Sequence, residues 1–153
     1  MNRHWLTSYG KRIPAEINPD TYGSVLEMLE SAMTRYAANP AFRCFGKTLT
    51  YTDTDRLSRA FAAFLQNRLG IKKGDRIAVM LPNLPAFPLA MLGIIRAGAI
   101  QVNVNPLYTP RELAHQLHDA GVKTVQRACF SVSTNPPILR GFGTSQFSAP
   151  IEK

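Results

Sequence analysis

The order of strand-like and helix-like segments between residues 74 and 121 predicts an α/β protein with a parallel-containing sheet and flanking helices. A continuous apolar run at 76–81 is typical of a strand covered on both faces. An apolar segment of helical length follows it and leads to a second strand-like run. Because parallel neighbours need a crossover connection, this succession indicates parallel strands joined by helices.

The chain begins with a segment that predicts an arm followed by a helix. Residues 1–23 hold prolines and no sustained periodicity, so we expect an extended arm that Trp5 and Tyr22 pin to the body. Ser24 has a glutamate three positions later, which is the spacing of a capping box at a helix start. Apolar residues then recur at helical spacing until Pro40, which disfavours helix in the residue before it.

A hairpin and a second helix are expected next. Short apolar and β-branched runs flank Gly46-Lys47, a pattern typical of two strands and a turn. Asp53 or Thr52 is expected to cap the helix that follows. Gly70 suits the left-handed position after its last residue.

The central unit contains the most regular pattern. Strands are expected at 76–81 and 99–104, with a helix at 85–97 between them. This helix is apolar nearly all round and therefore needs cover on several sides. Thr109, followed by proline and then glutamate, predicts a capped helix that Gly121 closes.

A third strand should begin at residues 122–125, after which periodicity is lost. Residues 126–153 are dominated by Ser, Thr, Pro and Gly, so we expect an irregular tail. The predicted organisation is thus an arm at 1–23, an α/β unit at 24–125 and a tail at 126–153.

The amino-acid composition indicates which kinds of partner and which cellular location to expect. The net charge of +8 arises from 18 basic and 10 acidic residues that are scattered along the chain, so no nucleic-acid partner is expected. The two cysteines, Cys44 and Cys129, form no ligand pattern and fit a reduced, cytoplasmic setting. The apolar segment 77–100 contains three prolines and Arg96, which favours a buried strand and helix over a membrane span.

Each group of residues that resembles a chemical site has a structural interpretation that we favour. The segment Gly141–Ser145 lacks the following lysine, preceding strand and helix of a phosphate loop. Glu112, His115 and His118 share one helix face but lack partner carboxylates from other helices, so a solvated face is expected. The remaining assignments are helix capping for Asp53 and Asp55, a turn and local ion pair for Asp75 and Arg76, strand-end bonding for Asn83, Asn103 and Asn105, and core packing for Phe61 and Phe64.

Several phrases carry a resemblance to a known family. The longest are Lys-Lys-Gly-Asp-Arg-Ile-Ala-Val-Met-Leu-Pro-Asn (72–83) and Val-Asn-Val-Asn-Pro-Leu-Tyr-Thr-Pro-Arg-Glu-Leu (102–113). Shorter ones are Ala-Glu-Ile-Asn-Pro-Asp (15–20), Lys-Thr-Leu-Thr-Tyr (47–51), Ser-Arg-Ala-Phe-Ala-Ala (58–63), Arg-Ala-Gly (96–98) and His-Gln-Leu-His-Asp-Ala-Gly (115–121). From about residue 5 to 125 the chain resembles the start of bacterial long-chain fatty acid–CoA ligases, which are AMP-forming, acyl-adenylating enzymes.

The resemblance implies a two-step reaction in which a fatty acid carboxylate attacks ATP to give acyl-AMP, and coenzyme A then displaces AMP. It also implies ATP, Mg²⁺ and coenzyme A as cofactors or substrates of the family. The family's phosphate loop, adenine-binding motif, ribose-binding aspartate and catalytic lysine are all absent from this sequence. We therefore assign no catalytic, cofactor-binding or metal-binding residue, and expect a truncated N-terminal part of an AMP-binding domain whose tail is read out of frame.

Three functions stay open. The first is a ligase-derived fragment that is inactive alone. The second is one part of a split ligase, completed by another polypeptide. The third is a non-enzymatic module that binds acyl chains, a membrane surface or a full-length ligase. We expect a cytoplasmic protein, with peripheral contact at the inner membrane as an alternative, and open sheet edges that favour association.

Overall fold

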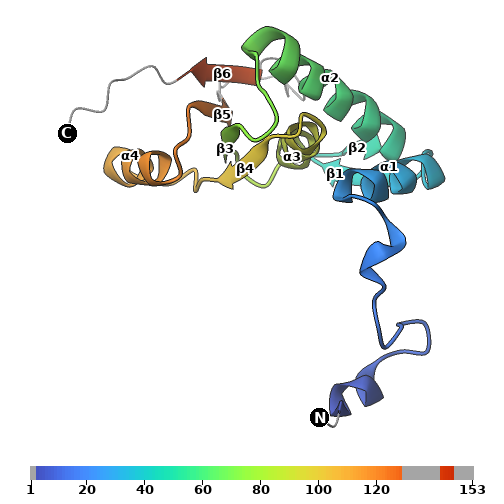
Figure 1. Cartoon of the computed structure of the whole chain (residues 1–153). Coiled ribbons are helices and arrows are strands. Elements are labelled where there is room, and N and C mark those ends of the chain that lie inside the picture. The colour runs from blue at the N-terminus through green and yellow to red at the C-terminus, as the bar shows by residue number, and fades with distance from the viewer. Residues whose placement is uncertain (1–2, 129–141, 147–153) are drawn as a thin grey trace.

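The computed structural model describes residues 3–128 and 142–146, with side-chain burial for residues 3–125. A four-stranded sheet lies between helices, a hairpin and a further helix lie beside it, and an N-terminal arm projects from the body (Figure 1). The strands are β1 (Pro40–Cys44), β2 (Lys47–Thr50), β3 (Arg76–Met80), β4 (Ile100–Asn103), β5 (Thr124–Ala128) and β6 (Phe142–Gln146). The helices are α1 (Val25–Arg35), α2 (Tyr51–Leu69), α3 (Ala86–Arg96) and α4 (Pro110–Asp119), with short 3-10 turns at His4–Ser8 and Pro19–Thr21.

The strand order β4-β3-β5-β6 confirms the predicted parallel-containing sheet. β3 pairs in parallel with β4, where Arg76 lies opposite Ile100, and with β5, where Ile77 lies opposite Thr124. β5 and β6 pair antiparallel. The chain therefore places its second parallel strand on one side of β3 and its third on the other, which requires the α4 connection to cross β3.

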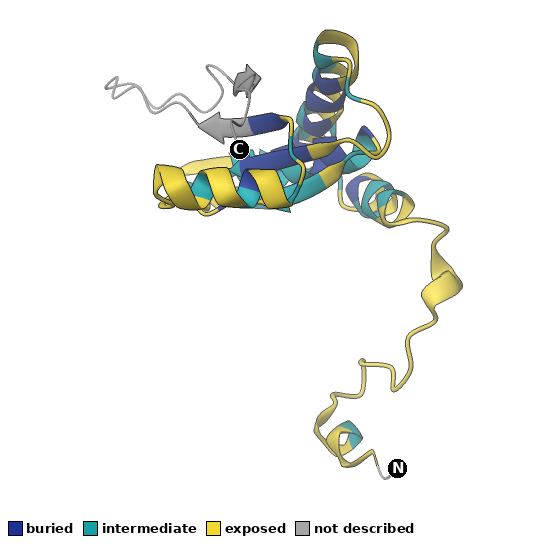
Figure 2. Ribbon diagram, turned by 60° about the vertical axis from the view of Figure 1, so that its left-hand side comes forward, coloured by how far each residue is buried: buried dark blue, intermediate teal, exposed yellow. Residues whose placement is uncertain are grey.

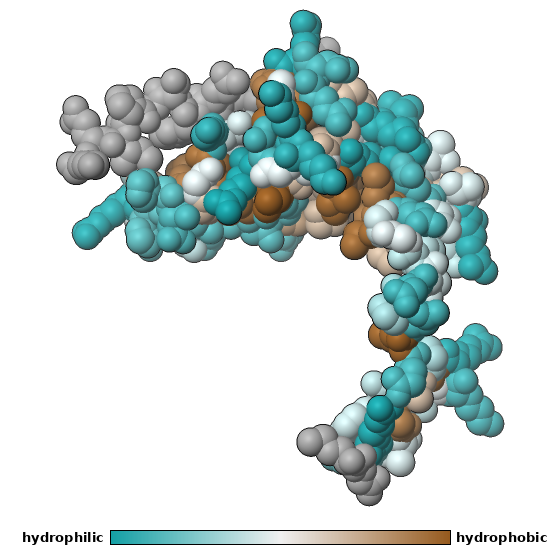
Figure 3. Space-filling model, in the orientation of Figure 1, coloured by the Kyte–Doolittle hydropathy of each residue, from teal (hydrophilic) through white to brown (hydrophobic). Residues whose placement is uncertain are grey.

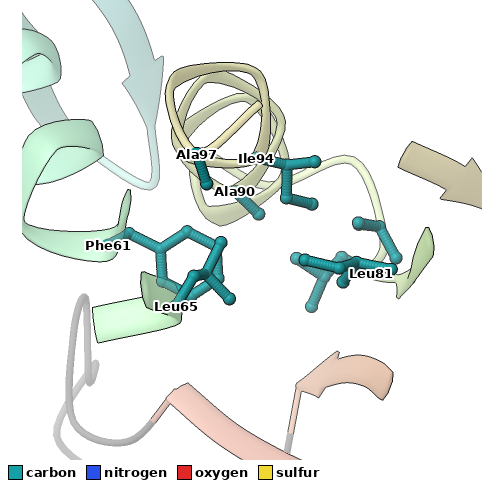
Figure 4. Packing of buried hydrophobic residues seen from close by; sticks show 8 residues of the cluster. Phe61, Leu65, Leu81, Ala90, Ile94 and Ala97 are labelled. Atoms are coloured by element: carbon teal, nitrogen blue, oxygen red, sulfur yellow. The ribbon is translucent and has the colours of Figure 1, made fainter. Parts of the chain in front are cut away.

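Both faces of β3 are buried, as its continuous apolar run predicts. Ile77 and Val79 face a core formed with α2 and α3, whereas Ala78 faces a second core formed with Leu117 of α4 and Val125 of β5. Figure 4 shows Phe61 and Leu65 of α2 close to Ala90, Ile94 and Ala97 of α3. The sheet is thus covered by α2 and α3 on one face and by α4 on the other.

Helix α3 is covered by α2 and by the sheet. Its residues are buried or half-buried, and none is exposed. The close approach of α2 provides this cover, since Gly93 lies directly against Phe61. The cover that its apolar surface requires is therefore provided largely by α2.

The hairpin forms as predicted, but its turn lies one residue earlier. Phe45 and Gly46 both have positive φ, of 46° and 73°, and join β1 to β2. Two consecutive left-handed residues are typical of the type I′ turn of a two-residue hairpin. Lys47, which we placed in the turn, is the first residue of β2.

The start of α2 also differs from the prediction by a few residues. Thr50 is the N-cap, and its hydroxyl accepts a hydrogen bond from the Asp53 amide at 3.1 Å. The Asp53 carboxylate accepts in return from the Thr50 amide at 3.2 Å, which completes a capping box. The predicted Gly70 stop is confirmed by its left-handed φ of 66°.

The arm is extended as predicted, but its aromatic residues do not hold it to the body. Figure 2 shows the arm exposed almost throughout. Trp5 is 46% exposed and Tyr22 is 42% exposed, so neither is pinned in a core. Neither 3-10 turn of the arm contains a buried residue, so the arm is not anchored in the core.

The region predicted as an irregular tail contains two stretches of strand. β5 continues to Ala128, and β6 pairs with it from Phe142 to Gln146. Main-chain pairing with β5 makes this possible without a strand-like side-chain pattern. The rest of the predicted tail, residues 129–141 and 147–153, lies outside the described residues.

Candidate functional site

The carboxyl ends of the parallel strands form the edge where an open α/β sheet normally binds its ligand. The chain runs from β3 to β4 on one side and from β4 across β3 to β5 on the other, so the switch in strand order falls between β3 and β5. The loop 81–85 after β3 and the loop 104–109 after β4 lie at this edge. Helix α3 begins directly after the first of these loops, and α4 begins directly after the second. The N-termini of both helices therefore lie at this edge of the sheet.

The N-terminus of α4 is closed by its own side chains. The Glu112 carboxylate accepts from the Thr109 amide and from the Thr109 hydroxyl, both at 2.8 Å. These bonds, the amide bond first, hold the pKa of Glu112 below its usual value. Because a carboxylate already lies at the positive end of the helix, a phosphate would meet repulsion there.

The loop before α4 is organised by main-chain bonding. The Asn105 side chain accepts from the Leu107 amide at 3.0 Å, which forms an Asx turn and confirms that this residue bonds the backbone. Asn103 instead accepts at its side chain from the Gln101 side chain at 2.6 Å. Leu107 is exposed at the tip of this turn.

The N-terminus of α3 has a different character. Pro85 occupies the cap position without a side-chain hydrogen bond, and the first turn holds no acidic residue. The residues around it are apolar or amide-bearing, with Asn83 exposed beside them. The first turn of this helix is therefore uncharged and holds no group that transfers a proton.

A charged cluster that the sequence analysis did not identify lies between α1, α2 and α3. The Arg96 side chain is only 6% exposed and pairs with Glu30 of α1 and with Asp55 of α2, the latter at 2.5 Å. Its Nε donates to the Ser58 hydroxyl at 3.1 Å. The oxygen partners of the guanidinium thus lie on α1 and α2, whereas Arg96 itself belongs to α3.

Arg59 joins the same cluster from the solvent side. It pairs with Asp55 at 2.9 Å and with Glu30 at 3.0 Å. The bond to Asp55, followed by the charge of that carboxylate, raises the pKa of Arg59. Two arginines and two carboxylates therefore balance in charge, as a partly buried group must. The only sequence signal was a single charge in an otherwise apolar helix, which gave no indication of its partners.

The paired aspartates near the start of α2 have structural partners, as expected, but of two kinds. Asp53 caps the helix, and its hydrogen bond from the Thr50 side chain lowers its pKa. Asp55 was also expected to cap but instead forms ion pairs with Arg59 and Arg96. Neither carboxylate is available as a catalytic partner of the other.

The turn before β3 is confirmed, but the local ion pair proposed there is wrong. The Asp75 carboxylate accepts from the Lys72 amide at 2.7 Å and closes the turn. The Arg76 guanidinium donates to the main-chain carbonyl of Ala120 at 2.8 Å, across the sheet edge. Each side chain therefore has a partner other than its neighbour.

The remaining candidate residues provide no chemical site in the structure. His115 and His118 are exposed, and the Glu112 carboxylate is engaged in capping. Phe61 and Phe64 stack at 6.3 Å within the core, as predicted. Gly143, Thr144 and Ser145 lie in β6, not in a phosphate loop. Within the part of the chain that the structure describes, no three His, Cys, Asp or Glu side chains converge to hold a metal.

The described residues do not fit ATP and Mg²⁺. A nucleotide site needs a phosphate-binding loop, and Mg²⁺ is held by carboxylates with the phosphates. Here the N-terminus of α4 is closed by Glu112, and the first turn of α3 holds no acidic residue and no side-chain cap. No helix among the described residues is long and apolar enough to cross a membrane.

Solved structures with this arrangement define the class of protein. The N-terminal subdomain of NpsA from Klebsiella oxytoca, in complex with 3-hydroxyanthranilyl-AMSN, matches 68% of this chain with a TM-score of 0.65 at 26% identity. The match covers 26% of that subdomain. NpsA in complex with the same compound gives a TM-score of 0.66 at 25% identity over 70% of this chain and 22% of that one. The fold is that of part of an adenylate-forming domain.

Comparison of the sequence with protein families identifies the family to which the chain belongs. The profile described as "AMP-binding enzyme" matches residues 29–140, and the chain belongs to this family. The match continues past residue 125, where we expected the resemblance to end.

Long-chain-fatty-acid–CoA ligases are among its relatives. The enzyme of Salmonella typhimurium is 56% identical over 125 residues, which are 82% of this chain and 22% of the relative. That of Yersinia pestis is 54% identical over an alignment of 159 residues, covering 97% of this chain and 28% of the relative. The chain thus spans about a quarter of the length of these relatives.

Proposed function

We propose that this chain supplies scaffold to a long-chain fatty acid–CoA ligase and has no ligase activity by itself. The observation that carries the proposal is the combination of 56% identity to such a ligase with a sheet edge that offers no site fitting ATP and Mg²⁺ among the described residues. The relatives' names support a long-chain fatty acid and coenzyme A as substrates of the complete enzyme. The family's description as an AMP-binding enzyme supports ATP as the third substrate. A cytoplasmic location is part of the same proposal.

The test is ATP–pyrophosphate exchange with a long-chain fatty acid, using the purified 153-residue chain. We expect no exchange above the rate without protein, because adenylation needs preorganised groups that stabilise the charge on the transferring phosphate. The full-length Salmonella typhimurium ligase is the positive control. Fatty acid-dependent exchange by this chain alone would contradict the proposal.

A second candidate function, contact with an anionic membrane surface, is favoured by the composition of the arm. Trp5, Tyr9, Ile13 and Ile17 are exposed there, and Lys11 and Arg12 lie among them. Figure 3 shows apolar surface along the arm alternating with polar surface. Aromatic and basic residues together suit the interface of a bilayer.

Co-sedimentation with vesicles separates this candidate from the first. We expect binding to vesicles of phosphatidylglycerol and weaker binding to phosphatidylcholine, with loss of the difference at high salt because surface charges are screened. A chain lacking residues 1–17 is the control and should remain in solution. Equal binding of the two chains would show that the arm is not the contact.

A further inference from the structure

The tip of the β1–β2 hairpin exposes a large apolar side chain. Phe45 and Leu107 are each 87% exposed, which makes them the two most exposed large apolar residues among those whose burial the structure describes. A single exposed apolar residue is ordinary on a protein surface. Phe45 differs from Leu107 in its backbone conformation and in the charge of its neighbours.

The backbone conformation of Phe45 disfavours a phenylalanine. With a φ of 46°, it is the only non-glycine residue of positive φ in the described part of the chain. It occupies the first position of a two-residue turn, where asparagine, aspartate or glycine is preferred. Residues in such sparsely populated conformations cluster at binding sites and switch regions. A role of the ring in binding therefore explains a residue that the turn itself disfavours.

Basic side chains flank this ring on both faces of the hairpin. Arg43 lies two positions before Phe45 and Lys47 two positions after it, and both are exposed. Lys47 pairs with Cys44 and Arg43 pairs with Thr48, so the two cations project from opposite faces. Neither cation forms an ion pair with any described residue. The tip thus combines one apolar ring with two uncompensated positive charges.

The charge of the surrounding segment complements an anionic lipid surface. Residues 31–52, which include the whole hairpin, contain three basic residues and no aspartate or glutamate. Aromatic rings suit the depth at which lipid headgroups meet acyl chains, and basic residues beside them are attracted to anionic headgroups. A protein partner would need acidic groups arranged around an apolar pocket, whereas an anionic bilayer presents both properties without a specific shape.

We propose that the hairpin tip inserts Phe45 into an anionic lipid surface while Arg43 and Lys47 contact the headgroups. The inference rests on the second candidate function, membrane contact through the arm, and adds a second contact to it. Figure 1 shows the hairpin beside α1, from whose start the arm leaves the body. Because the arm is not anchored in the core, it can lie on the same lipid surface as the tip.

The two contacts strengthen each other because they belong to one chain. Once the arm has bound, the tip meets the lipid surface at a high effective concentration. One inserted ring and two cations then increase an affinity that they could not produce alone. A chain without residues 1–17 should accordingly remain in solution even though it keeps the hairpin.

Tryptophan fluorescence at two positions tests the tip directly. Trp5 is the only tryptophan of the chain, so the wild type reports on the arm. The double variant Trp5→Phe/Phe45→Trp places the only indole at the hairpin tip. On vesicles that contain phosphatidylglycerol, we expect a blue shift of the tip indole and quenching by brominated acyl chains, because the ring leaves water for the bilayer interface. Vesicles of phosphatidylcholine alone should produce a smaller shift.

Co-sedimentation with the same vesicles measures the contribution of the ring. Phe45→Asn should weaken binding of the full chain about tenfold, because the transfer of an aromatic ring out of water is lost. The same change should stabilise the fold, so weaker binding would not reflect unfolding. Leu107→Asn is the matched control, since Leu107 is equally exposed but has no basic residue within three positions. Its affinity for the vesicles should equal that of the wild type.

A charge variant tests the flanking cations. Arg43→Gln should weaken binding to phosphatidylglycerol vesicles about fivefold, because each basic residue near an anionic surface adds to the attraction. Binding to phosphatidylcholine should not change. Equal loss on both kinds of vesicle would show that the arginine does not act through headgroup charge and would overturn its assigned contact.

The outcomes separate this inference from the membrane contact of the arm. If the emission of Trp5 shifts on vesicles but the tip indole does not, or if Phe45→Asn binds as tightly as the wild type, the inference is wrong and the arm binds without the tip. A shift of the tip indole alone supports the inference and makes the assignment to the arm wrong. A shift at neither position overturns both. A chain that self-associates without lipid, and becomes monomeric with Phe45→Asn, would assign the tip to a second copy and overturn the lipid contact.

Discussion

Phe45 is a single residue held in a conformation that its side chain does not favour. Its φ of 46° lies in the left-handed region, and its side chain is 87% exposed at the tip of the hairpin. Left-handed backbone costs an L-residue with a large side chain roughly 1–2 kcal/mol. The exposed ring therefore gives no packing energy that would offset the strain.

We predict that Phe45→Asn stabilises the chain, because asparagine tolerates the left-handed region through local hydrogen bonding. The expected increase in the free energy of unfolding is about 0.5–1 kcal/mol. Urea denaturation followed by circular dichroism measures it. Phe45→Ala is the control, since alanine keeps the conformational cost, and equal stability of the two variants would contradict the explanation.

Arg96 is a second residue with a specific structural role, because its guanidinium is buried among carboxylates. Its buried guanidinium balances Glu30 and Asp55, which also pair with Arg59 at the surface. Removal of one partner from a buried ion pair leaves the other without compensation, which costs about 3–5 kcal/mol when both are fully buried. Here both carboxylates are partly exposed, so the cost should be smaller.

We predict that Arg96→Met lowers the free energy of unfolding by about 2–3 kcal/mol. Arg96→Lys should recover only part of this loss, because one ammonium cannot reproduce the planar fork of the guanidinium. Urea midpoints measure both changes. The matched control is Arg56→Met, which removes an exposed pair with Asp53 and should cost less than about 1 kcal/mol. Similar losses for the two methionine variants would argue against a structural role for the cluster.

At the level of secondary-structure elements, the capping boxes are the features most directly specified by local sequence. Thr109 and Glu112 close α4, and hydrogen bonding lowers the pKa of Glu112 below its ordinary value of 4.5. A carboxyl with a lowered folded-state pKa stabilises the fold above its unfolded pKa. That contribution is lost as the pH falls through the folded-state pKa.

We predict that the wild-type chain is more stable than Glu112→Gln at pH 7 and that the advantage disappears as the pH falls below 4.5. Glutamine keeps the hydrogen-bonding geometry of a capping box but removes the charge. Urea midpoints from pH 7 to pH 3 measure the difference. His115→Gln on the exposed face of α4 serves as the control, and its midpoint should follow the wild type between pH 4.5 and pH 3. A difference between Glu112→Gln and wild type that persists at pH 3 would contradict the assignment.

The contact between α2 and α3 depends on a glycine. A Cβ added at Gly93 would lie 2.6 Å from Phe61 Cδ1 and 3.1 Å from the Ser58 carbonyl. Such distances require the two helices or the buried ring to move, since interiors are packed at near-crystalline density. The glycine therefore sets how closely these helices approach.

We predict that Gly93→Ala lowers the free energy of unfolding by about 1–3 kcal/mol through overpacking. Alanine gains about 1 kcal/mol in helix propensity, but the clash outweighs that gain. Thermal and urea denaturation measure the change. Gly10→Ala is the control because nothing lies within 4 Å of its added Cβ, and its effect should stay within about 0.5 kcal/mol. A Gly93→Ala chain that is more stable than the wild type would show that the Phe61 ring moves aside at little cost, and would contradict the overpacking explanation.

In the whole molecule, stability is concentrated in the sheet and its helices, and the arm contributes little. Neither 3-10 turn of the arm contains a buried residue, and Figure 1 shows the arm leaving the body near α1. In contrast, α1 contributes the buried Met33 and the ion pairs of Glu30. The boundary of the folded unit therefore falls close to Ser24.

We predict that deletion of residues 1–17 changes the free energy of unfolding by less than about 0.5 kcal/mol, because no buried contact is lost. Deletion of residues 1–36 is the comparison and should destabilise strongly, since it removes α1 and leaves Arg96 with fewer partners. Urea midpoints of the two shortened chains measure the contrast. An equal loss for both would mean that the arm packs on the body.

The amino-acid sequence by itself determined the local elements and the family. The capping box of α4, Gly70 after α2 and the apolar run of β3 were readable because they depend on neighbours a few residues away. Predicted positions were wrong by one to three residues where several neighbouring residues could form the cap or the turn, as at Thr50 and in the Phe45-Gly46 turn.

Only the tertiary structure decided the partners of distant residues. Arg96 finds Glu30 66 positions away, Arg76 finds the Ala120 carbonyl 44 positions away, and β4 becomes an end strand because β5 pairs on the other side of β3. Periodicity specifies which face of an element is buried but not what lies against it, since that depends on strand order and helix packing. For this reason the sequence predicted the fold class and the family, whereas the charged cluster became visible only in three dimensions.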